Sequence, residues 1–299
     1  MAVVVTFRDE ERCLPRFLAS LAAQTAPPES VVLVDDGSTD ASAQIAADFV
    51  RRHPGARLVR RPPRARERDR LVAGSVWSSF QEAVATLEHD HDVVAKLDAD
   101  LVLPPELLAE ITAAFAADPR LGLTGPYLSE RAADGTLQRI RWRPEHVAGA
   151  TKFYRRRCYD DVHPLPPLLN LDMVDEVKAR SRGWRTASFA AAGGDPLHLR
   201  AEATHDGLLR GLRRRGAAEY VSGGHPLLVL YMGLQRVARP PRIVGTLHYF
   251  AGWLSAAARR VPRFDADLRE LRRREQLLRV RERVAGRFGR TRRVTRTGA

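Results

Sequence analysis

Cysteine is scarce in this chain of 299 residues, which has only Cys13 and Cys158. Two cysteines cannot build a disulfide framework or a structural zinc site. Their small number suits a reducing compartment, and we expect a cytoplasmic protein.

Long apolar runs are missing as well. No stretch of 18 apolar residues occurs, so we expect no ordinary transmembrane helix. The chain enters an apolar run at residues 3–5 without the charged and then apolar segments of a secretory signal. No internal repeat is apparent at periods of 20–50 residues, which argues against a solenoid.

Acidic residues are outnumbered, because 36 Asp and Glu stand against 49 Lys and Arg, for a net charge of +13. Most of this excess lies in residues 259–299, which contain 15 arginines, no lysine and five acidic residues. We expect this tail to begin as a basic, partly amphipathic helix and to end as a disordered stretch. It lacks interleaved aromatic residues on a sheet and a DNA-binding motif, so we expect no nucleic-acid partner.

Strand-like and helix-like segments alternate over the first 125 residues. Short apolar or β-branched runs fall at residues 2–6, 30–34, 56–59, 93–97 and 121–125. This alternation predicts an α/β fold with a mostly parallel sheet and helices on both faces. In such sheets ligands gather at the carboxyl ends of the strands.

Acidic residues stand at two of these strand ends. Asp35 and Asp36 open the turn Asp35-Asp36-Gly37-Ser38-Thr39-Asp40, and Asp98 and Asp100 follow the run at 93–97. Residues i and i+2 of a strand point to the same side, so Asp98 and Asp100 are candidates to present their oxygens together. Hard oxygen ligands suit Mg²⁺ or Mn²⁺. A capped βα turn and a solvated loop start are the alternatives.

Three segments, taken in order, resemble the signatures of family 2 glycosyltransferases. They are Val3-Val4-Val5-Thr6-Phe7-Arg8-Asp9-Glu10-Glu11, the acidic turn that starts at Asp35, and Lys96-Leu97-Asp98-Ala99-Asp100. The members of that family are inverting enzymes with the GT-A fold, a Rossmann-like architecture. The resemblance implies a GT-A domain over residues 1–200, with a nucleotide-sugar half at about 1–125 and an acceptor half at about 126–200.

The resemblance also implies residues that bind the donor nucleotide. Thr6, Phe7 and Arg8 would line the base pocket, and Asp35 or Asp36 would bind uracil or a related base. This chain has Arg8-Asp9 where the family often has an aromatic residue and Asn. The resemblance therefore does not indicate how the base would be stacked.

The third segment implies a cation site. Asp98 and Asp100 would contact the ribose and a divalent cation, Mg²⁺ or Mn²⁺, that bridges the diphosphate. In related enzymes a histidine or a His-x-Arg pair further along completes the metal or diphosphate site, which points to His198 in His198-Leu199-Arg200. A purely structural histidine is the alternative.

A run of arginines at residues 60–70 separates a strand from a helix, and we expect most of it to be a solvated loop. The family usually places a basic residue in this region, and arginine forms bidentate pairs with phosphates. One of Arg66, Arg68 and Arg70 is therefore a candidate to contact the donor's phosphates.

A further acidic segment, Leu171-Asp172-Met173-Val174-Asp175-Glu176, precedes Gly183-Trp184. It suits a helix N-terminus, where the helix dipole favours negative charge. Counted back from Gly-Trp, Asp172 occupies the position of the family's catalytic base, which takes the proton of the acceptor hydroxyl. Asp175 and Glu176 are the fallback candidates. The family often has Glu-Asp where this chain has Leu-Asp.

Two apolar segments, residues 226–238 and 243–258, lie in an expected helical region at 201–258. They are too short and interrupted to span a bilayer, but Tyr and Trp among Leu and Val, with Arg at the ends, are typical of interfacial helices. With the basic tail at 259–299, they predict attachment to the anionic inner face of the cell membrane, where each basic residue contributes about 1 kcal/mol. A helical subdomain with a solubilising tail is the alternative.

Together these features predict a metal-dependent, inverting transfer of a sugar from a nucleotide diphosphate-sugar, with a UDP-sugar favoured, to a hydroxyl of a saccharide or lipid-linked acceptor. A nucleotidyltransferase of the same fold is one alternative, but such enzymes usually have a Gly-rich loop after the first strand, and residues 6–12 contain no glycine. A basic membrane- or nucleic-acid-binding protein without catalysis is the other.

Overall fold

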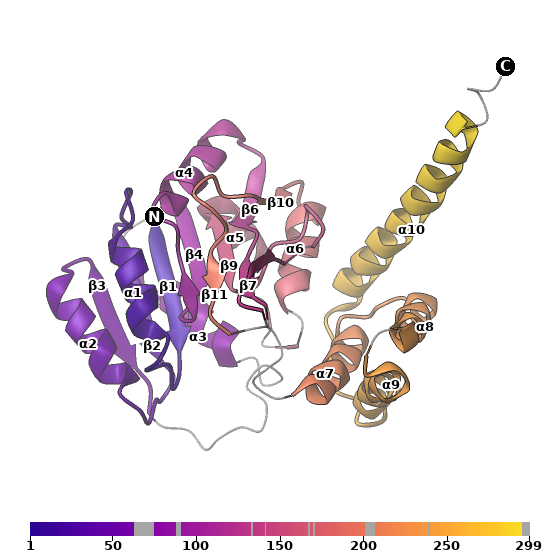
Figure 1. Ribbon diagram of the computed structural model, residues 1–299, viewed down its shortest axis with the longest axis horizontal. Coiled ribbons are helices and arrows are strands. Elements are labelled where there is room, and N and C mark those ends of the chain that lie inside the picture. The colour runs from indigo at the N-terminus through magenta and orange to yellow at the C-terminus, as the bar shows by residue number, and fades with distance from the viewer. Residues whose placement is uncertain are drawn as a thin grey trace. The chain divides into compact units, whose positions relative to one another are not determined.

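The computed structural model describes residues 1–62, 75–87, 91–132, 134–140, 142–166, 168–169, 171–200, 207–238 and 240–294. The chain forms two compact units, Met1–Pro167 with Leu171–His205, and Asp206–Ala299 with Leu168–Asn170. We call them unit 1 and unit 2. The predicted α/β architecture with additional C-terminal helices is confirmed (Figure 1).

Unit 1 is built on a seven-stranded sheet with the order β10-β6-β9-β4-β1-β2-β3. The strands are β1 (Ala2–Phe7), β2 (Ser30–Asp35), β3 (Ala56–Arg60), β4 (Val93–Asp98), β6 (Leu121–Pro126), β9 (Thr151–Arg155) and β10 (Arg185–Phe189). Of these seven strands, β9 alone runs antiparallel to its neighbours. Every residue of the central strand β1 is buried, which explains its continuous apolar run.

A smaller sheet of four short strands, with the order β5-β11-β7-β8, lies at the end of β4. Its strands are β5 (Leu101–Val102), β7 (Ser129–Arg131), β8 (Leu137–Arg139) and β11 (Leu197–His198). His198 of β11 pairs with Leu101 of β5, which follows β4 directly. This pairing brings a late segment of the chain next to the carboxyl end of β4.

Helices cover the main sheet in unit 1. They are α1 (Leu14–Ala22), α2 (Ser42–Arg52), α3 (Ser75–Ala85), α4 (Leu107–Ala117), α5 (Arg156–Val162) and α6 (Leu171–Ser181). Buried residues of α1, α2 and α4, such as Phe17, Phe49 and Ile111, share a core with Val3 and Val5 of β1. An aromatic cluster joins α3 to β9 and α5, and it consists of Trp77, Phe80, Tyr154, Tyr159 and His163.

Unit 2 is helical. It contains α7 (Leu208–Val221), α8 (Pro226–Gln235), the 3-10 turn η1 (Arg236–Ala238), α9 (Arg242–Ala258) and α10 (Ala266–Val294). Helices α7 and α9 cross at glycines, since a Cβ at Gly216 would lie 1.9 Å from the carbonyl oxygen of Tyr249. Arg272 of α10 is 2% exposed and donates to Glu219 of α7 (2.7 Å), so the first part of the basic tail is packed inside this unit.

No helix within the described ranges is long and apolar enough to cross a bilayer.

Candidate active site

The carboxyl ends of three neighbouring parallel strands bring predicted site residues to one edge of the main sheet. In the register of the sheet, Thr6 of β1 lies opposite Asp98 of β4, and Phe7 lies opposite Asp35 of β2. The backbone N–H of Asp36 donates to the carbonyl of Phe7 (2.9 Å). These five residues therefore share one edge, and their contacts with a nucleotide stay predictions.

The acidic turn after β2 is stabilised by a hydrogen bond between a backbone N–H and the Asp35 carboxylate. Asp35 is 1% exposed, and its Oδ1 accepts a hydrogen bond from the backbone N–H of Ser38 (2.8 Å). Gly37 between them has φ 78°, a left-handed conformation that glycine adopts without strain.

The end of β1 carries a buried hydroxyl, Thr6 Oγ1, which has no hydrogen-bond partner within the described ranges. A buried hydroxyl without a partner is costly, so a polar group of a ligand would be favoured there.

Arg8, the third residue predicted for the base pocket, begins the loop between β1 and α1. Its Nε lies 3.6 Å from Asp9 Oδ2, and Asp9 in turn accepts a hydrogen bond from the backbone N–H of Thr39 (2.7 Å). The loop after β1 and the turn after β2 are thus tied together at this edge.

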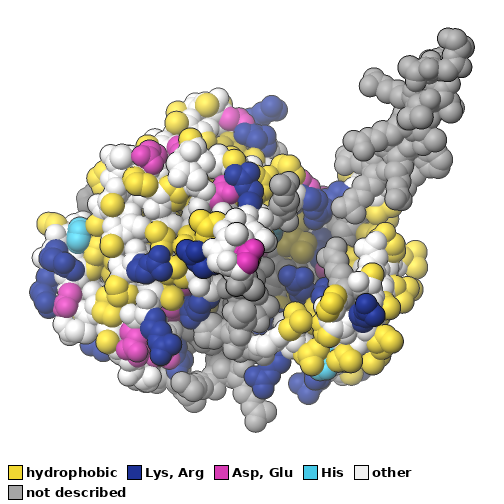
Figure 2. All heavy atoms as spheres, in the orientation of Figure 1, with side chains coloured by type: hydrophobic (Ala, Val, Ile, Leu, Met, Phe, Trp, Pro, Cys, Tyr) yellow, Lys and Arg dark blue, Asp and Glu magenta, His cyan; other side chains and the backbone are white. Residues whose placement is uncertain are grey.

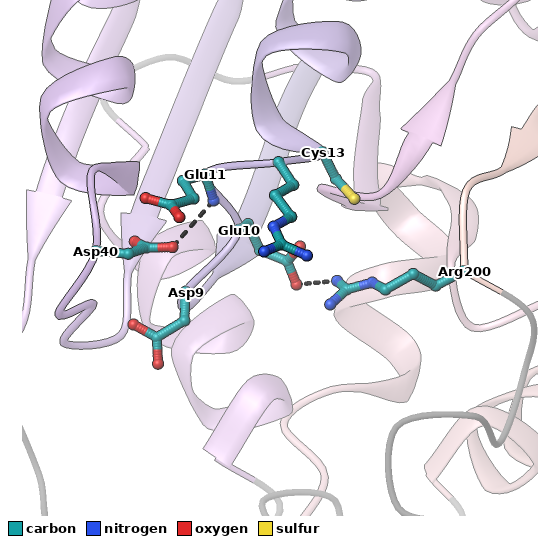
Figure 3. Close-up of a pocket in the computed structure, with 7 residues that line it drawn as sticks. Asp9, Glu10, Glu11, Cys13, Asp40 and Arg200 are labelled. Atoms are coloured by element: carbon teal, nitrogen blue, oxygen red, sulfur yellow. Dashed lines mark hydrogen bonds and ion pairs between the residues drawn. The ribbon is translucent and has the colours of Figure 1, made fainter.

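A pocket of about 440 Å³ is lined by residues 9–13 of that loop, by Asp40 and by Arg200 (Figure 3). Arg200 reaches across it and forms an ion pair with Glu10. The same arginine donates from Nε to Asp100 Oδ2 (3.2 Å), which connects the pocket to the end of β4. Burial raises the pKa of Glu10, although Arg200 acts in the opposite direction.

Asp98 and Asp100 take different partners. Asp98 Oδ1 accepts a hydrogen bond from Lys96 Nζ (2.6 Å), whereas Asp100 Oδ2 lies 3.4 Å from His198 Nε2. Strand β4 ends at Asp98, and the turn that follows breaks the alternation that would have kept both side chains on one side.

The Asp100–His198 pair has the donor chemistry of a divalent-cation site. His198 Nδ1 lies 3.4 Å from Glu130 Oε1, and a carboxylate behind a histidine is common at metal centres. Burial opposes ionisation of Asp100, but His198 and Arg200 outweigh it and lower the pKa of this carboxyl.

Asp100 and His198 alone would supply only part of the coordination shell of a bound cation, and other groups would have to supply the rest. No set of three or more His, Cys, Asp or Glu within the described ranges is disposed to hold a metal ion. Mg²⁺ and Mn²⁺ tolerate few protein ligands when water and substrate phosphates supply the rest, so the residues present fit such a cation.

Asp172, the predicted base, is joined to the same edge through Gly149. A Cβ added at Gly149 would lie 2.4 Å from Asp172 Oδ2 and 2.5 Å from Oδ1, so the glycine leaves room for that carboxylate. Lys96 Nζ donates both to Asp98 Oδ1 (2.6 Å) and to the carbonyl of Gly149 (2.7 Å). The first turn of α6 and the end of β4 therefore meet, although they are far apart in the sequence.

The Asp172 carboxylate is partly withdrawn from water. Its Oδ1 is buried and accepts no hydrogen bond from the described residues. Burial raises the pKa of Asp172, and the charges of Lys152 and Lys96 oppose this effect. A carboxylate with a raised pKa is a stronger base, provided it remains ionised at the working pH.

Asp175 and Glu176, the fallback candidates, have their oxygens engaged in the protein. Asp175 is fully buried and accepts hydrogen bonds from Lys152 Nζ (2.6 and 2.8 Å) and from the Tyr154 hydroxyl. Glu176 Oε1 accepts one from a backbone N–H of the loop before β9 (2.8 Å). Because Lys152 Nζ also donates to the carbonyl of Asp172 (2.7 Å), this network fixes the first turn of α6.

Lys152 is not among the site residues predicted from the sequence. It lies opposite Lys96 in the register of β9 and β4, and both ammonium groups stand over the Trp77 ring, at 5.8 and 5.5 Å from its centroid. A lysine inside the apolar run Thr151-Lys152-Phe153-Tyr154 was the available signal, because a buried lysine requires an acidic partner.

The arginine run after β3 gives no further site residue. Arg66, Arg68 and Arg70 lie outside the described residues. The predicted contact between one of them and the donor's phosphates stays a prediction.

Comparison with known sequences gives two findings. The profile of the family described as Glycosyl transferase family 2 matches residues 2–165. The undecaprenyl-phosphate 4-deoxy-4-formamido-L-arabinose transferase of Pectobacterium carotovorum subsp. carotovorum is 38% identical over 112 residues, which are 36% of this chain. The match spans 30% of the length of that relative.

Comparison with solved structures shows the GT-A fold. The mannosyltransferase PcManGT from Pyrobaculum calidifontis, in complex with GDP-Man and Mn²⁺, is similar over 86% of this chain and 72% of its own, with a TM-score of 0.53 and 16% identity. TarS 1-349 of S. aureus, in complex with UDP-GlcNAc, is similar over 85% of this chain and 78% of its own, with a TM-score of 0.55 and 16% identity.

Proposed function

The chain belongs to glycosyl transferase family 2, and we propose that it transfers a sugar from a nucleotide diphosphate-sugar to a hydroxyl of a saccharide or lipid-linked acceptor. A UDP-sugar is the favoured donor, and the transfer inverts the anomeric carbon. The TarS complex with UDP-GlcNAc supports this donor class, and the undecaprenyl-phosphate named for the curated relative supports a lipid-linked acceptor.

One observation carries the proposal. The Asp172 carboxylate lies against Gly149, and its buried Oδ1 accepts no hydrogen bond from the described residues. Lys96 Nζ donates both to the carbonyl of Gly149 and to Asp98. A carboxylate thus lies next to the strand edge to which we assign the donor. This juxtaposition is what a direct displacement at a sugar carbon needs.

The donor side is assigned to the ends of β1, β2 and β4. Thr6 Oγ1, Asp35 and Asp36 would bind the base and Asp98 the ribose. Asp100 and His198 would hold a divalent cation. Such a cation, when bound, neutralises charge on the departing diphosphate.

The acceptor side is assigned to Asp172. As the acceptor oxygen forms its bond to the anomeric carbon, the bond from that carbon to the diphosphate oxygen breaks, and the hydroxyl proton passes to Asp172. Lys152, Asp175 and Tyr154 hold the first turn of α6 and so keep this carboxylate in place.

The donor assignment is tested with a panel of nucleotide sugars and Mn²⁺, with release of the nucleotide as the readout. We expect turnover with at least one UDP-sugar and weaker nucleotide binding in Asp98→Ala. Asp160→Asn is the matched control, because Asp160 is an exposed carboxylate on α5 paired with Arg156. No turnover with any donor, together with unchanged nucleotide binding in Asp98→Ala, would overturn the proposal.

The proposal also covers location. A lipid-linked acceptor requires the enzyme to work at a membrane surface, and we place it as a peripheral protein on the inner face of the cell membrane. The exposed apolar side chains of unit 2 support this part of the proposal.

A further inference from the structure

Helix α9 is apolar on two sides. The side buried within unit 2 is lined by Gly245, Thr246, Tyr249, Gly252 and Ala256. It packs closely on α7, because a Cβ at Gly252 would lie 1.9 Å from the carbonyl oxygen of Arg213. The exposed side carries Ile243, Val244, Leu247 and Leu254, which are 50–65% exposed. One apolar side suffices to pack a helix on its neighbour, so the exposed side calls for a second apolar environment.

Helix α8 continues this pattern. Its exposed residues Leu227, Leu230, Tyr231 and Leu234 recur at i, i+3, i+4 and i+7, which is one side of a helix, and they are 49–69% exposed. Helices α8 and α9 pack on each other where Gly233 meets the Phe250 ring. We call these two sets of exposed residues the apolar stripes of α8 and α9.

The two stripes leave large apolar side chains in water. Figure 2 shows hydrophobic side chains gathered over this part of unit 2. Eight large side chains that are each about half exposed or more present on the order of several hundred Å². Exposed apolar area of that order on a soluble protein often marks an interaction surface or a membrane-binding surface.

The charge of the segment indicates what covers this surface. Residues 226–258 contain three arginines, Arg236, Arg239 and Arg242, and no Asp or Glu. A second copy of the chain, docked through the same surface about a two-fold axis, would bring these arginines together without a carboxylate from this segment to pair with them. A bilayer with anionic headgroups offers an apolar interior beside negative charge.

We propose that the apolar stripes of α8 and α9 lie on an anionic lipid bilayer, with the leucines at the acyl boundary and Arg242 among the headgroups. The helices rest on the surface, since neither is long enough to cross it. This inference rests on the proposed function. It names the membrane surface on which the enzyme would bind a lipid-linked acceptor.

The test is flotation of the full chain with vesicles of phosphatidylcholine and phosphatidylglycerol at about 70:30, and with phosphatidylcholine alone. We expect binding to the anionic vesicles, at least about tenfold weaker binding to the neutral ones, and a loss of at least about tenfold in the double variant Leu227→Gln/Leu247→Gln. Leu137→Gln/Leu208→Gln is the matched control and should float like the wild type, since both leucines are more than half exposed but lie outside the stripes.

Two further measurements check that the double variant is folded and active, and that α9 contacts the lipid. Circular dichroism and donor hydrolysis in solution should be the same in the double variant and the wild type. In Leu247→Trp, added anionic vesicles should shift the additional emission to the blue, and brominated lipids should quench it.

Three outcomes would overturn the inference. They are wild-type protein that does not float, a double variant that floats like the wild type, and a wild-type dimer in sedimentation that the double variant abolishes without any vesicle binding. Failure of the proposed function is recognised separately, as normal flotation without turnover of any donor.

Discussion

Replacing Lys152 with methionine tests how α6 is supported. The side chains of Lys152 and Asp175 are both 0% exposed, with Nζ 2.6 Å from Oδ2. Methionine fills similar space but leaves the Asp175 carboxylate buried without its cation. Removing one partner of a buried ion pair costs about 3–5 kcal/mol, which is a large part of the 5–15 kcal/mol that usually stabilises a domain.

The assay is urea denaturation of the wild type, Lys152→Met, Asp175→Leu and the double variant. We expect a loss of about 3–5 kcal/mol for Lys152→Met and a smaller loss for the double variant, because an apolar pair of similar size replaces a buried ion pair at little cost. The coupling between the two sites should reach about 2 kcal/mol. Arg156→Met, which removes a partly exposed i,i+4 pair with Asp160, should cost less than about 1 kcal/mol.

The same variants can also be compared in turnover and in nucleotide binding. Lys152 Nζ donates to the carbonyl of Asp172, so turnover should fall in Lys152→Met more than nucleotide binding does. The reasoning fails if Lys152→Met unfolds within about 1 kcal/mol of the wild type, or if the double variant loses the sum of the two single losses.

Three other predictions concern single residues. Gly149→Ala should lower turnover by about 10²-fold with nucleotide binding retained, because its Cβ would displace the Asp172 carboxylate; unchanged turnover would contradict this. Burial lowers the pKa of His163 to about 4, below the 6.5 of an unfolded histidine. The unfolded chain therefore takes up the proton first, and the free energy of unfolding should fall as the pH drops from 6.5 to 4, by up to about 1.4 kcal/mol per pH unit. Denaturation at several pH values should show a shallower slope in His163→Gln, and an equal slope would refute the assignment. His198→Ala should raise the Mn²⁺ concentration for half-maximal turnover by about 10- to 100-fold, whereas an unchanged requirement would remove His198 from the cation site.

Much of unit 1 could be predicted from the sequence because local patterns carry it. The runs at β1, β2 and β4 are buried on both faces and end in polar residues, so their order along the chain already placed Thr6, Asp35 and Asp98 at one edge.

What the sequence left open depends on pairings between distant segments. Strand β9 enters the sheet antiparallel and places Lys152 opposite Lys96, and no local pattern specifies that register. The pairing of β11 with β5 likewise brings His198 next to Asp100, although the two residues are far apart in the sequence.

The basic tail shows the same limit. Its composition predicted a basic, partly amphipathic helix, but it did not indicate that Arg272 is buried against Glu219 or that Phe264 is 2% exposed. Composition reports an average over a segment, whereas burial is decided by each residue's place on the helix.

The most direct test of the proposed mechanism is the turnover of Asp172→Asn with the preferred nucleotide sugar, measured beside its affinity for the free nucleotide. Asparagine keeps the size of the side chain but cannot accept the proton. We predict a fall in turnover of about 10²- to 10⁴-fold with the nucleotide affinity unchanged. Turnover within a few-fold of the wild type would show that Asp172 is not the base.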